Sequence, residues 1–259
     1  MLSSSIYNKR RQDLIKHMGK GVAILKGAPE QIRTHDTEYP YRQDSDFYYL
    51  TGYTEPGAAC IIDPNNKDNP FSLFVLPQDP KKEVWTGWRL SFADTVVKFG
   101  ADQALDISEF EANALAAMKT SSKVYTNLNH DKTHQYKMID HVGQVRKDVQ
   151  RTGGGPEGLE SIGAITHGMR LIKDDHEVEL MQKAADISAD AHSRAMQACK
   201  PGMYEYQLQA VLESHFVHEG GSGPAYTSIV GAGDNATVLH YIKNRDQIVD
   251  GRSEERRVG

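Results

Sequence analysis

The chain has 259 residues, of which 39% are hydrophobic and 25% charged, so it can bury one large core or two modest ones. Its formal net charge of −5 gives no sign of a nucleic-acid partner, and no apolar run approaches the roughly 20 residues of a membrane span. The two cysteines, Cys60 and Cys199, are too few for a disulfide framework or a thiolate metal site. We therefore expect both thiols to be core residues of a protein in a reducing, cytoplasmic compartment.

The N-terminus is serine-rich at residues 3–5 and basic at residues 9–11, which faintly resembles an organelle transit peptide. A structural helix is the interpretation we favour, because Gly19 supplies a stop and four apolar residues share one face: Ile6, Leu14, Ile15 and Met18. The Lys9-Arg10-Arg11 cluster is then expected on the solvated face of that helix.

Short apolar runs alternate with helical patterns through the next hundred residues. The strands predicted from these runs cover residues 22–25, 60–62, 71–76 and 123–128. Ser91 and Ser108 are expected to cap helices at residues 92–99 and 109–118. This alternation is typical of an α/β (α+β) domain with a mixed sheet and flanking helices.

Two segments interrupt this pattern with aromatic and charged residues. In residues 38–57 the tyrosines are expected to fill gaps between layers, with Arg42 paired locally to Asp44 and Asp46. Both tryptophans, Trp85 and Trp88, fall in a short polar segment that is expected to form a loop. An indole in such a loop packs down, meets a partner or contacts a ligand.

A glycine-rich linker at residues 152–158 follows a helical pattern interrupted by Gly143, and it separates an N-terminal domain, residues 1–160, from a second domain, residues 161–251. The second domain opens with the best helical pattern in the chain. Its start carries a capping box, Asp174 with Glu177, and its apolar stripe follows a spacing of three or four residues: Leu180, Ala184, Ile187, Ala191, Ala195 and Ala198. A second amphipathic helix is expected at residues 204–219.

The most informative segment lies near the end of the chain. Residues 228–230 and 237–242 predict two strands around a tight turn, and His240 comes at the end of the second. From such a sheet edge a histidine could point into a cleft and move a proton near neutral pH. Residues 248–251 predict the start of another buried strand, but residues 252–259 are highly charged and are interpreted as a non-native tail.

Two further patterns could indicate a nucleotide site and a metal site. Residues 231–236 match the dinucleotide fingerprint G-x-G-x-x-A, but an extended segment is expected next where a phosphate site needs a helix. His215 and His218 lie three apart on a helix and could share a metal ion. No neighbouring carboxylate completes a ligand set, so a surface or cleft-edge pair is favoured.

Four of these segments together resemble the aminopeptidase P (Xaa-Pro aminopeptidase) family: residues 38–57, 83–90, 169–202 and 229–241. The resemblance implies that the second domain is an incomplete pita-bread (creatinase/aminopeptidase) domain. It also implies a catalytic and substrate-binding role for His240 and a substrate-binding role for Trp85 in a homo-oligomer. In that family two manganese ions act on peptides with proline in the second position, and the metal ligands all follow the His240 segment.

From this resemblance we expect a C-terminally truncated metallopeptidase chain without metal ligands, inactive by itself. Two alternatives stay open: a non-catalytic oligomerisation or peptide-docking module, and a creatinase-like relative that acts on a non-peptide carbon–nitrogen bond. We also expect a loosened C-terminal third, with four apolar side chains exposed: Ile229, Val230, Val238 and Leu239.

Overall fold

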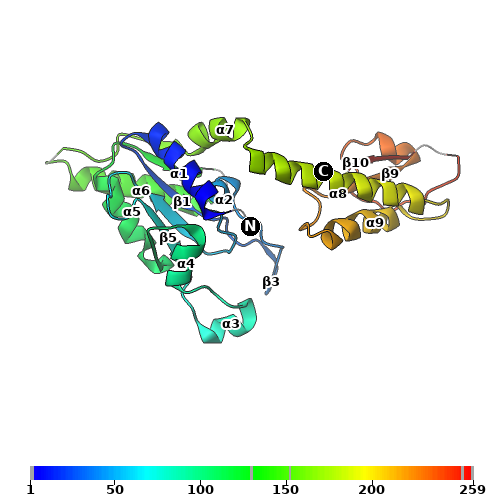
Figure 1. The fold of residues 1–259 in the computed structure, drawn as a ribbon, viewed down its shortest axis with the longest axis horizontal. Coiled ribbons are helices and arrows are strands. Elements are labelled where there is room, and N and C mark those ends of the chain that lie inside the picture. Colours follow the sequence, from blue (N-terminus) through cyan, green and yellow to red (C-terminus); the bar gives the residue numbers. More distant parts are fainter. Residues whose placement is uncertain (1–2, 129–130, 152, 252–253, 258–259) are drawn as a thin grey trace. The chain divides into compact units, whose positions relative to one another are not determined.

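The computed structural model describes residues 3–128, 131–151, 153–251 and 254–257. The chain divides into two compact units, residues 1–172 and 173–259 (Figure 1). This division lies beyond position 160, because helix α7 (Gly163–Leu171) packs on helix α1 (Ser4–Met18) of the first unit. No helix of the described residues is both long and apolar enough to cross a membrane.

The first unit is built around a mixed sheet with the strand order β6-β5-β4-β1-β7-β8 (Figure 1). Strand β4 is antiparallel to both of its neighbours, whereas the other adjacent pairs run parallel. The strands are β1 (Val22–Lys26), β4 (Ala59–Ile62), β5 (Phe71–Val75), β6 (Gln103–Asp106), β7 (Val124–Thr126) and β8 (Leu159–Ser161). Strands β2 (Ile32–Thr34) and β3 (Thr37–Glu38) form a separate hairpin. The mixed sheet predicted from the alternating runs is confirmed.

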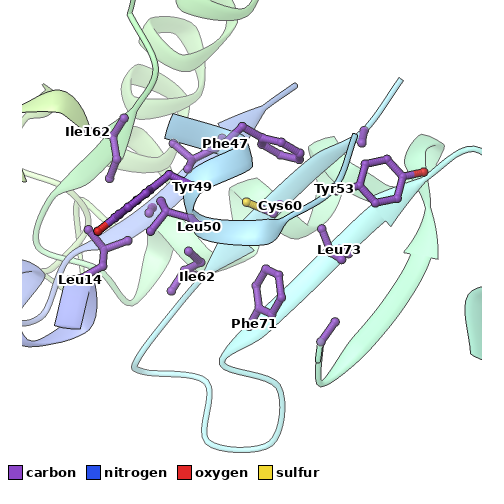
Figure 2. Packing of buried hydrophobic residues seen from close by; sticks show 14 of the residues in the cluster. Leu14, Phe47, Tyr49, Leu50, Tyr53, Cys60, Ile62, Phe71, Leu73 and Ile162 are labelled. Atoms are coloured by element: carbon purple, nitrogen blue, oxygen red, sulfur yellow. The ribbon is translucent and has the colours of Figure 1, made fainter. Parts of the chain in front are cut away.

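Helices cover both faces of this sheet. Helices α1, α2 (Ser45–Thr51), α4 (Phe92–Phe99) and α7 pack on one face, and α5 (Phe110–Lys119) and α6 (Lys132–Asp148) on the other. Successive residues of β1 alternate between the two cores: Ala23 and Leu25 lie in the first, Val22 and Ile24 in the second. Figure 2 shows side chains of the first core, including Phe47, Leu50 and Leu73.

Of the basic cluster of α1, Lys9 is exposed as predicted, whereas Arg10 and Arg11 are not on a solvated face. Arg10 and Arg11 are 6% and 2% exposed. The Arg11 guanidinium donates hydrogen bonds to the carbonyl oxygens of Leu50 (3.0 Å) and Gly100 (2.8 Å) and stacks 3.8 Å from the centre of the Phe71 ring. Burial lowers the pKa of Arg11 to about 10. The prediction was wrong because carbonyl groups and a ring from distant segments replace the water around this cation.

One of the two serine helix caps predicted from the sequence is confirmed and the other is wrong. Ser91 caps α4 through a hydrogen bond from the Asp94 amide, as predicted. Ser108 is not a cap, because a 3-10 turn, η1 (Ile107–Glu109), precedes α5, and the Asp106 carboxylate accepts the Ser108 amide. Helix α6 continues through Gly143 without a break.

The acidic residues of segment 38–57 also have partners other than those expected. The Asp44 carboxylate caps α2 by accepting the amides of Asp46 and Phe47. Asp46 pairs with Arg170 of α7 at 3.0 Å, whereas Arg42 donates to the Ser45 hydroxyl. The expected pairing of Arg42 with both aspartates is therefore wrong. The Asp46 contact fastens α7 to the first unit.

The second unit contains α8 (Asp175–Ala198), α9 (Glu205–His218), strand β9 (Ile229–Ala232), the 3-10 turn η2 (Gly233–Thr237) and strand β10 (Glu254–Arg257). The capping box of Asp174 and Glu177 is confirmed at the start of α8. Only Ala191 and Ala195 of the predicted stripe are buried, and Leu180 is exposed. The core of this unit joins residues of α8, α9 and β9 with one from the C-terminal segment: Ala191, Ala195, Leu208, Leu212, Phe216, Val230 and Ile248.

The C-terminal segment differs from the expected arrangement in three respects. Val230 is buried, although Val238 and Leu239 are exposed as predicted. Ile248 is buried without belonging to a strand, and its neighbour Gln247 makes only an isolated bridge to Tyr204. Residues 254–257, part of the supposed tail, pair antiparallel with β9, while residues 252–253 and 258–259 lie outside the described residues.

Candidate functional site: the His240 turn and its supports

The buried carboxylate of Glu205, at the first residue of α9, organises the segment around His240. Glu205 is 0% exposed. Its Oε1 accepts hydrogen bonds from the Ala232 amide (2.8 Å) and Asn235 Nδ2 (3.0 Å). Its Oε2 accepts from Tyr241 Oη (2.7 Å) and the Asp246 amide (3.0 Å). Four donors therefore compensate the cost of removing this carboxylate from water.

The phenol of Tyr241 is part of this network and is itself buried. Burial raises the pKa of Tyr241, and the hydrogen bond that its hydroxyl donates to Glu205 raises it further. Asn235 Nδ2 also donates to the Asp246 carboxylate at 2.7 Å. The network thus links the start of α9, the end of β9, the η2 turn and the segment after His240.

A second buried polar side chain, Asn244, holds the base of the same segment. Its Oδ1 accepts the Val230 amide (3.0 Å), and its Nδ2 donates to Gln209 Oε1 (2.9 Å) and the Ser228 carbonyl oxygen (2.8 Å). Asn244 has a φ of 47°, in the left-handed region that asparagine tolerates better than other non-glycine residues. Its side chain therefore satisfies backbone groups of Ser228 and Val230.

His240 itself lies in a turn between η2 and Tyr241, and its side chain is exposed. The predicted second strand at residues 237–242 does not form. Val238 donates its amide to the Asn235 carbonyl oxygen and Tyr241 donates to the Val238 carbonyl oxygen, so the backbone turns repeatedly. Short turn hydrogen bonds have replaced the sheet partner that an extended β-branched run would need.

Two cavities adjoin this segment. The larger, about 320 Å³, is lined by Ala232, Gly233, Asp234, Asn235, Asp246, Gln247 and Val249. The smaller, about 120 Å³, is lined by Ile229, Gly231, Asn235, Ala236, Thr237, Val238 and Leu239. His240 lines neither cavity, although Asn235 lines both.

Trp85 is placed in the first unit, on helix α3 (Pro80–Thr86) rather than in a loop. Trp85 and Trp88 are 87% and 92% exposed. Both border a cavity of about 360 Å³. The charged residues that line this cavity are Glu30, Glu38, Glu55 and Arg89. The indoles therefore do not pack down onto the first unit.

The two histidines of α9 have different surroundings. His215 is buried and its Nε2 lies 3.0 Å from Asp190 of α8, whereas His218 is exposed. The expectation of a surface or cleft-edge pair is therefore wrong for His215. Among the described residues no group of three or more His, Cys, Asp or Glu side chains could hold a metal ion.

The glycine pattern at residues 231–236 has a packing role. A Cβ atom at Gly231 would lie 2.8 Å from the backbone of Asn235, so the close approach of η2 requires glycine here. Gly233 begins a five-residue 3-10 turn, Gly233–Thr237, and not the α-helix that a phosphate site needs. This geometry gives no support to a nucleotide site.

Comparisons with known proteins identify the family. The model for the aminopeptidase P N-terminal domain matches residues 7–125, and the model for metallopeptidase family M24 matches residues 179–253. The Xaa-Pro aminopeptidase of Escherichia coli K12 is 34% identical over 252 residues, which cover 96% of this chain and 57% of that protein. The structure of Pseudomonas aeruginosa aminopeptidase PepP matches with a TM-score of 0.94 at 37% identity, covering 100% of this chain and 59% of that chain.

The chain belongs to the aminopeptidase P family. Proline aminopeptidase P II from Yersinia pestis gives a TM-score of 0.92 at 34% identity and covers 100% of this chain and 60% of that chain. The predicted α/β fold is thus confirmed, and the second unit is part of the pita-bread domain of an aminopeptidase P. The chain spans between 57% and 60% of the length of these three relatives.

Membership in a metallopeptidase family implies use of a divalent metal ion. The described residues of this aminopeptidase P chain do not supply a fitting donor set. The sequence predicts His240 as a site residue, but it did not indicate the two residues that hold its segment, Glu205 and Asn244. No local signal marks them, since Glu205 resembles any acidic residue in the first turn of a helix and Asn244 any polar residue of a loop.

Proposed function

We propose that this chain forms the N-terminal domain and part of the catalytic domain of a manganese-dependent Xaa-Pro aminopeptidase. Such an enzyme removes the N-terminal residue that precedes proline in a peptide. The observation that carries the proposal is the match of the whole chain to aminopeptidase PepP, with a TM-score of 0.94 at 37% identity. The names of the relatives supply the reaction, and the cytoplasm is the compartment that suits the free thiols of Cys60 and Cys199.

In this proposal His240 contacts the peptide and exchanges a proton with it. Support comes from its exposed side chain on a turn that buried polar groups hold from both sides. An imidazole gains or loses a proton near neutral pH, which suits it to this task.

The chain by itself is inactive in this proposal, because its described residues offer no cluster of donors for manganese. The test incubates the purified 259-residue chain with Mn²⁺ and an Xaa-Pro peptide. Titration calorimetry follows metal binding and chromatography follows release of the first residue. We expect neither tight binding nor release. Stoichiometric Mn²⁺ uptake together with release of the N-terminal residue would contradict the inactivity.

Trp85 contacts the peptide in this proposal, in a homo-oligomer where its helix faces a neighbouring subunit. Its 87% exposure and the adjoining cavity support the assignment. Because Trp85 and Trp88 are the only tryptophans, W88F leaves Trp85 as the sole indole reporter, and W85F is the matched control. Titration with a proline-second peptide should change the fluorescence of W88F and not that of W85F. Equal responses from both variants would remove Trp85 from the proposed binding site.

A non-catalytic module is the second candidate, favoured by the exposed tryptophans of the first unit. Such a module would self-associate or bind peptides without binding metal. Light scattering after size exclusion, compared between the wild type and W85A/W88A, distinguishes it.

A creatinase-like activity on a non-peptide carbon–nitrogen bond is tested by offering the chain such a substrate beside the peptide.

A further inference from the structure

The contacts of Glu205 concentrate on the two sides of His240. Three of its four donors belong to one stretch of chain: Asn235 before His240, Tyr241 next to it, and Asp246 after it. The Glu205 amide also donates to the Asp246 carbonyl oxygen at 3.0 Å, so this contact is made in both directions. Glu205 therefore holds both ends of the turn that carries the histidine.

Within the described part of the chain, the His240 imidazole makes no hydrogen bond or ion pair of its own. Its position consequently depends on the backbone of residues 238–245, which belongs to no helix or strand. The donors at Asn235 and Tyr241 restrain the chain three residues before Val238 and immediately after His240.

If Glu205 served only to stabilise the fold, a buried carboxylate would be a poor choice, because removing its charge from water costs free energy. An apolar side chain of similar volume often stabilises as well, and ionic groups are retained in some proteins because they select one arrangement. Each donor to Glu205 must reach one of two oxygen atoms, which admits far fewer loop conformations than apolar contact does. The chemistry of the network thus favours definition of geometry over stabilisation.

We propose that Glu205 is a positioning residue, which holds the backbone of the His240 turn so that the imidazole meets its substrate in one orientation. The part of this statement that concerns substrate rests on the proposed function. The part that concerns the turn does not, and it can be measured in the 259-residue chain without any peptide.

The decisive variant is Glu205→Gln, which keeps the volume but replaces one accepting oxygen with an NH₂ group. The Tyr241 hydroxyl can turn to accept from that group, whereas the Asp246 amide can only donate. We therefore expect the amide to face Tyr241 and Asp246, leaving the Asp246 N–H without an acceptor. Hydrogen exchange of the Asp246 amide should become about ten-fold faster or more, while the Ala232 amide keeps its protection.

The positioning itself is read from backbone NMR relaxation of His240. In the wild type we expect an order parameter close to that of a rigid backbone, about 0.85, and in Glu205→Gln a value below about 0.6. Glu213→Gln is the matched control, because Glu213 lies on the same helix and its carboxylate accepts from Ser228 and Gln209 instead. His240→Ala should leave the exchange of the Asp246 amide unchanged, since the network does not include the imidazole.

Unchanged His240 order and unchanged Asp246 exchange in folded Glu205→Gln would overturn the proposal. If that variant does not fold, Tyr241→Phe removes only the donor next to His240 and should lower its order parameter by a smaller amount. A rigid His240 in Tyr241→Phe would then overturn it. Failure of the proposed substrate role of His240 is seen separately, as equal affinity of the wild type and His240→Ala for a proline-second peptide, and changes neither measurement.

Discussion

Buried backbone groups find their hydrogen-bond partners in different ways in the two compact units. In the first unit a six-stranded sheet pairs its strands with one another, and apolar cores cover both faces. In the second, the amides of Val230, Ala232 and Asp246 are satisfied by the side chains of Asn244 and Glu205. The difference shows that the strands of a larger sheet need chiefly apolar burial, whereas the two-stranded β9–β10 sheet and the irregular segment beside it need specific polar side chains.

The largest expected effect comes from cutting into an apolar core of the first unit. Phe74 is fully buried on β5, with its ring 5.4 Å from that of Phe110. Phe74→Ala should lower the free energy of unfolding by about 3–5 kcal/mol, through lost burial and the cavity left behind. Denaturant titration measures the change, and Val97→Ala on an exposed position of α4 should cost less than about 0.5 kcal/mol. Similar losses for both would show that this core does not support the unit.

A buried histidine makes the free energy of unfolding of the first unit depend on pH, by nearly as much as the loss expected for Phe74→Ala. His134 is 2% exposed; burial, and after it the charge of Lys26, lowers its pKa to about 4 from the ordinary value of 6.5. The Thr126 hydroxyl donates its one proton to the Ile24 carbonyl oxygen, so His134 Nε2 donates to Thr126 Oγ1 at 2.8 Å. The native site therefore prefers the neutral ring.

Above pH 6.5 the ring is neutral in both folded and unfolded chains, and its contribution to stability is fully present. Between pH 6.5 and about 4 only the unfolded chain takes up the proton, so stability falls by about 1.4 kcal/mol per pH unit, about 3 kcal/mol in total. His134→Gln, which cannot titrate, should remove this part of the slope in denaturant titrations at several pH values. Parallel profiles for wild type and variant would contradict the assignment.

The next effect tests the polar support of the second unit. Asn244→Ala should cost about 2–3 kcal/mol, since it leaves the Val230 amide and the Ser228 carbonyl oxygen without partners. Asn244→Gly loses the same hydrogen bonds but relieves the left-handed backbone, so it should be roughly 1 kcal/mol more stable than Asn244→Ala. Hydrogen exchange of the Val230 amide locates both losses. Equal stability of the two variants would exclude backbone conformation as a reason for asparagine.

The smallest effect should come from the start of α8, where the signal is local. Asp174→Ala removes the capping box and should cost about 1 kcal/mol, observed as faster exchange of the first-turn amides. Asp175→Ala, one residue later on an exposed position, should change exchange by far less. If Asp174→Ala lowered the free energy of unfolding more than Asn244→Ala does, local capping would matter more than the polar contacts between distant segments, contrary to this expectation.

Where a residue's partner lies within one turn of the chain, most predictions were correct, with Ser108 and Asp44 as exceptions. The Asp174 capping box, the Ser91 cap and the apolar strands β1, β4 and β5 are examples, because each depends on residues nearby in sequence or on burial of a continuous apolar run. Where the partner was distant, prediction failed. Arg11 was expected in water but donates to Gly100, and Asp46 was expected near Arg42 but pairs with Arg170.

The candidate site shows the same division. Its histidine is predicted from the residues around it, but the strand expected at residues 237–242 did not form, because no strand within the described residues pairs with them.

The sequence by itself determined the family and the alternation of helices and strands, and it predicts His240 as a site residue, since these follow from short-range patterns and side-chain chemistry. Only the tertiary structure decided that Glu205 and Asn244 support that histidine and that Arg10 and Arg11 are buried. A polar side chain carries no local mark of whether it will face water or be enclosed with donors and acceptors from elsewhere, and that choice depends on which distant segments fold against it.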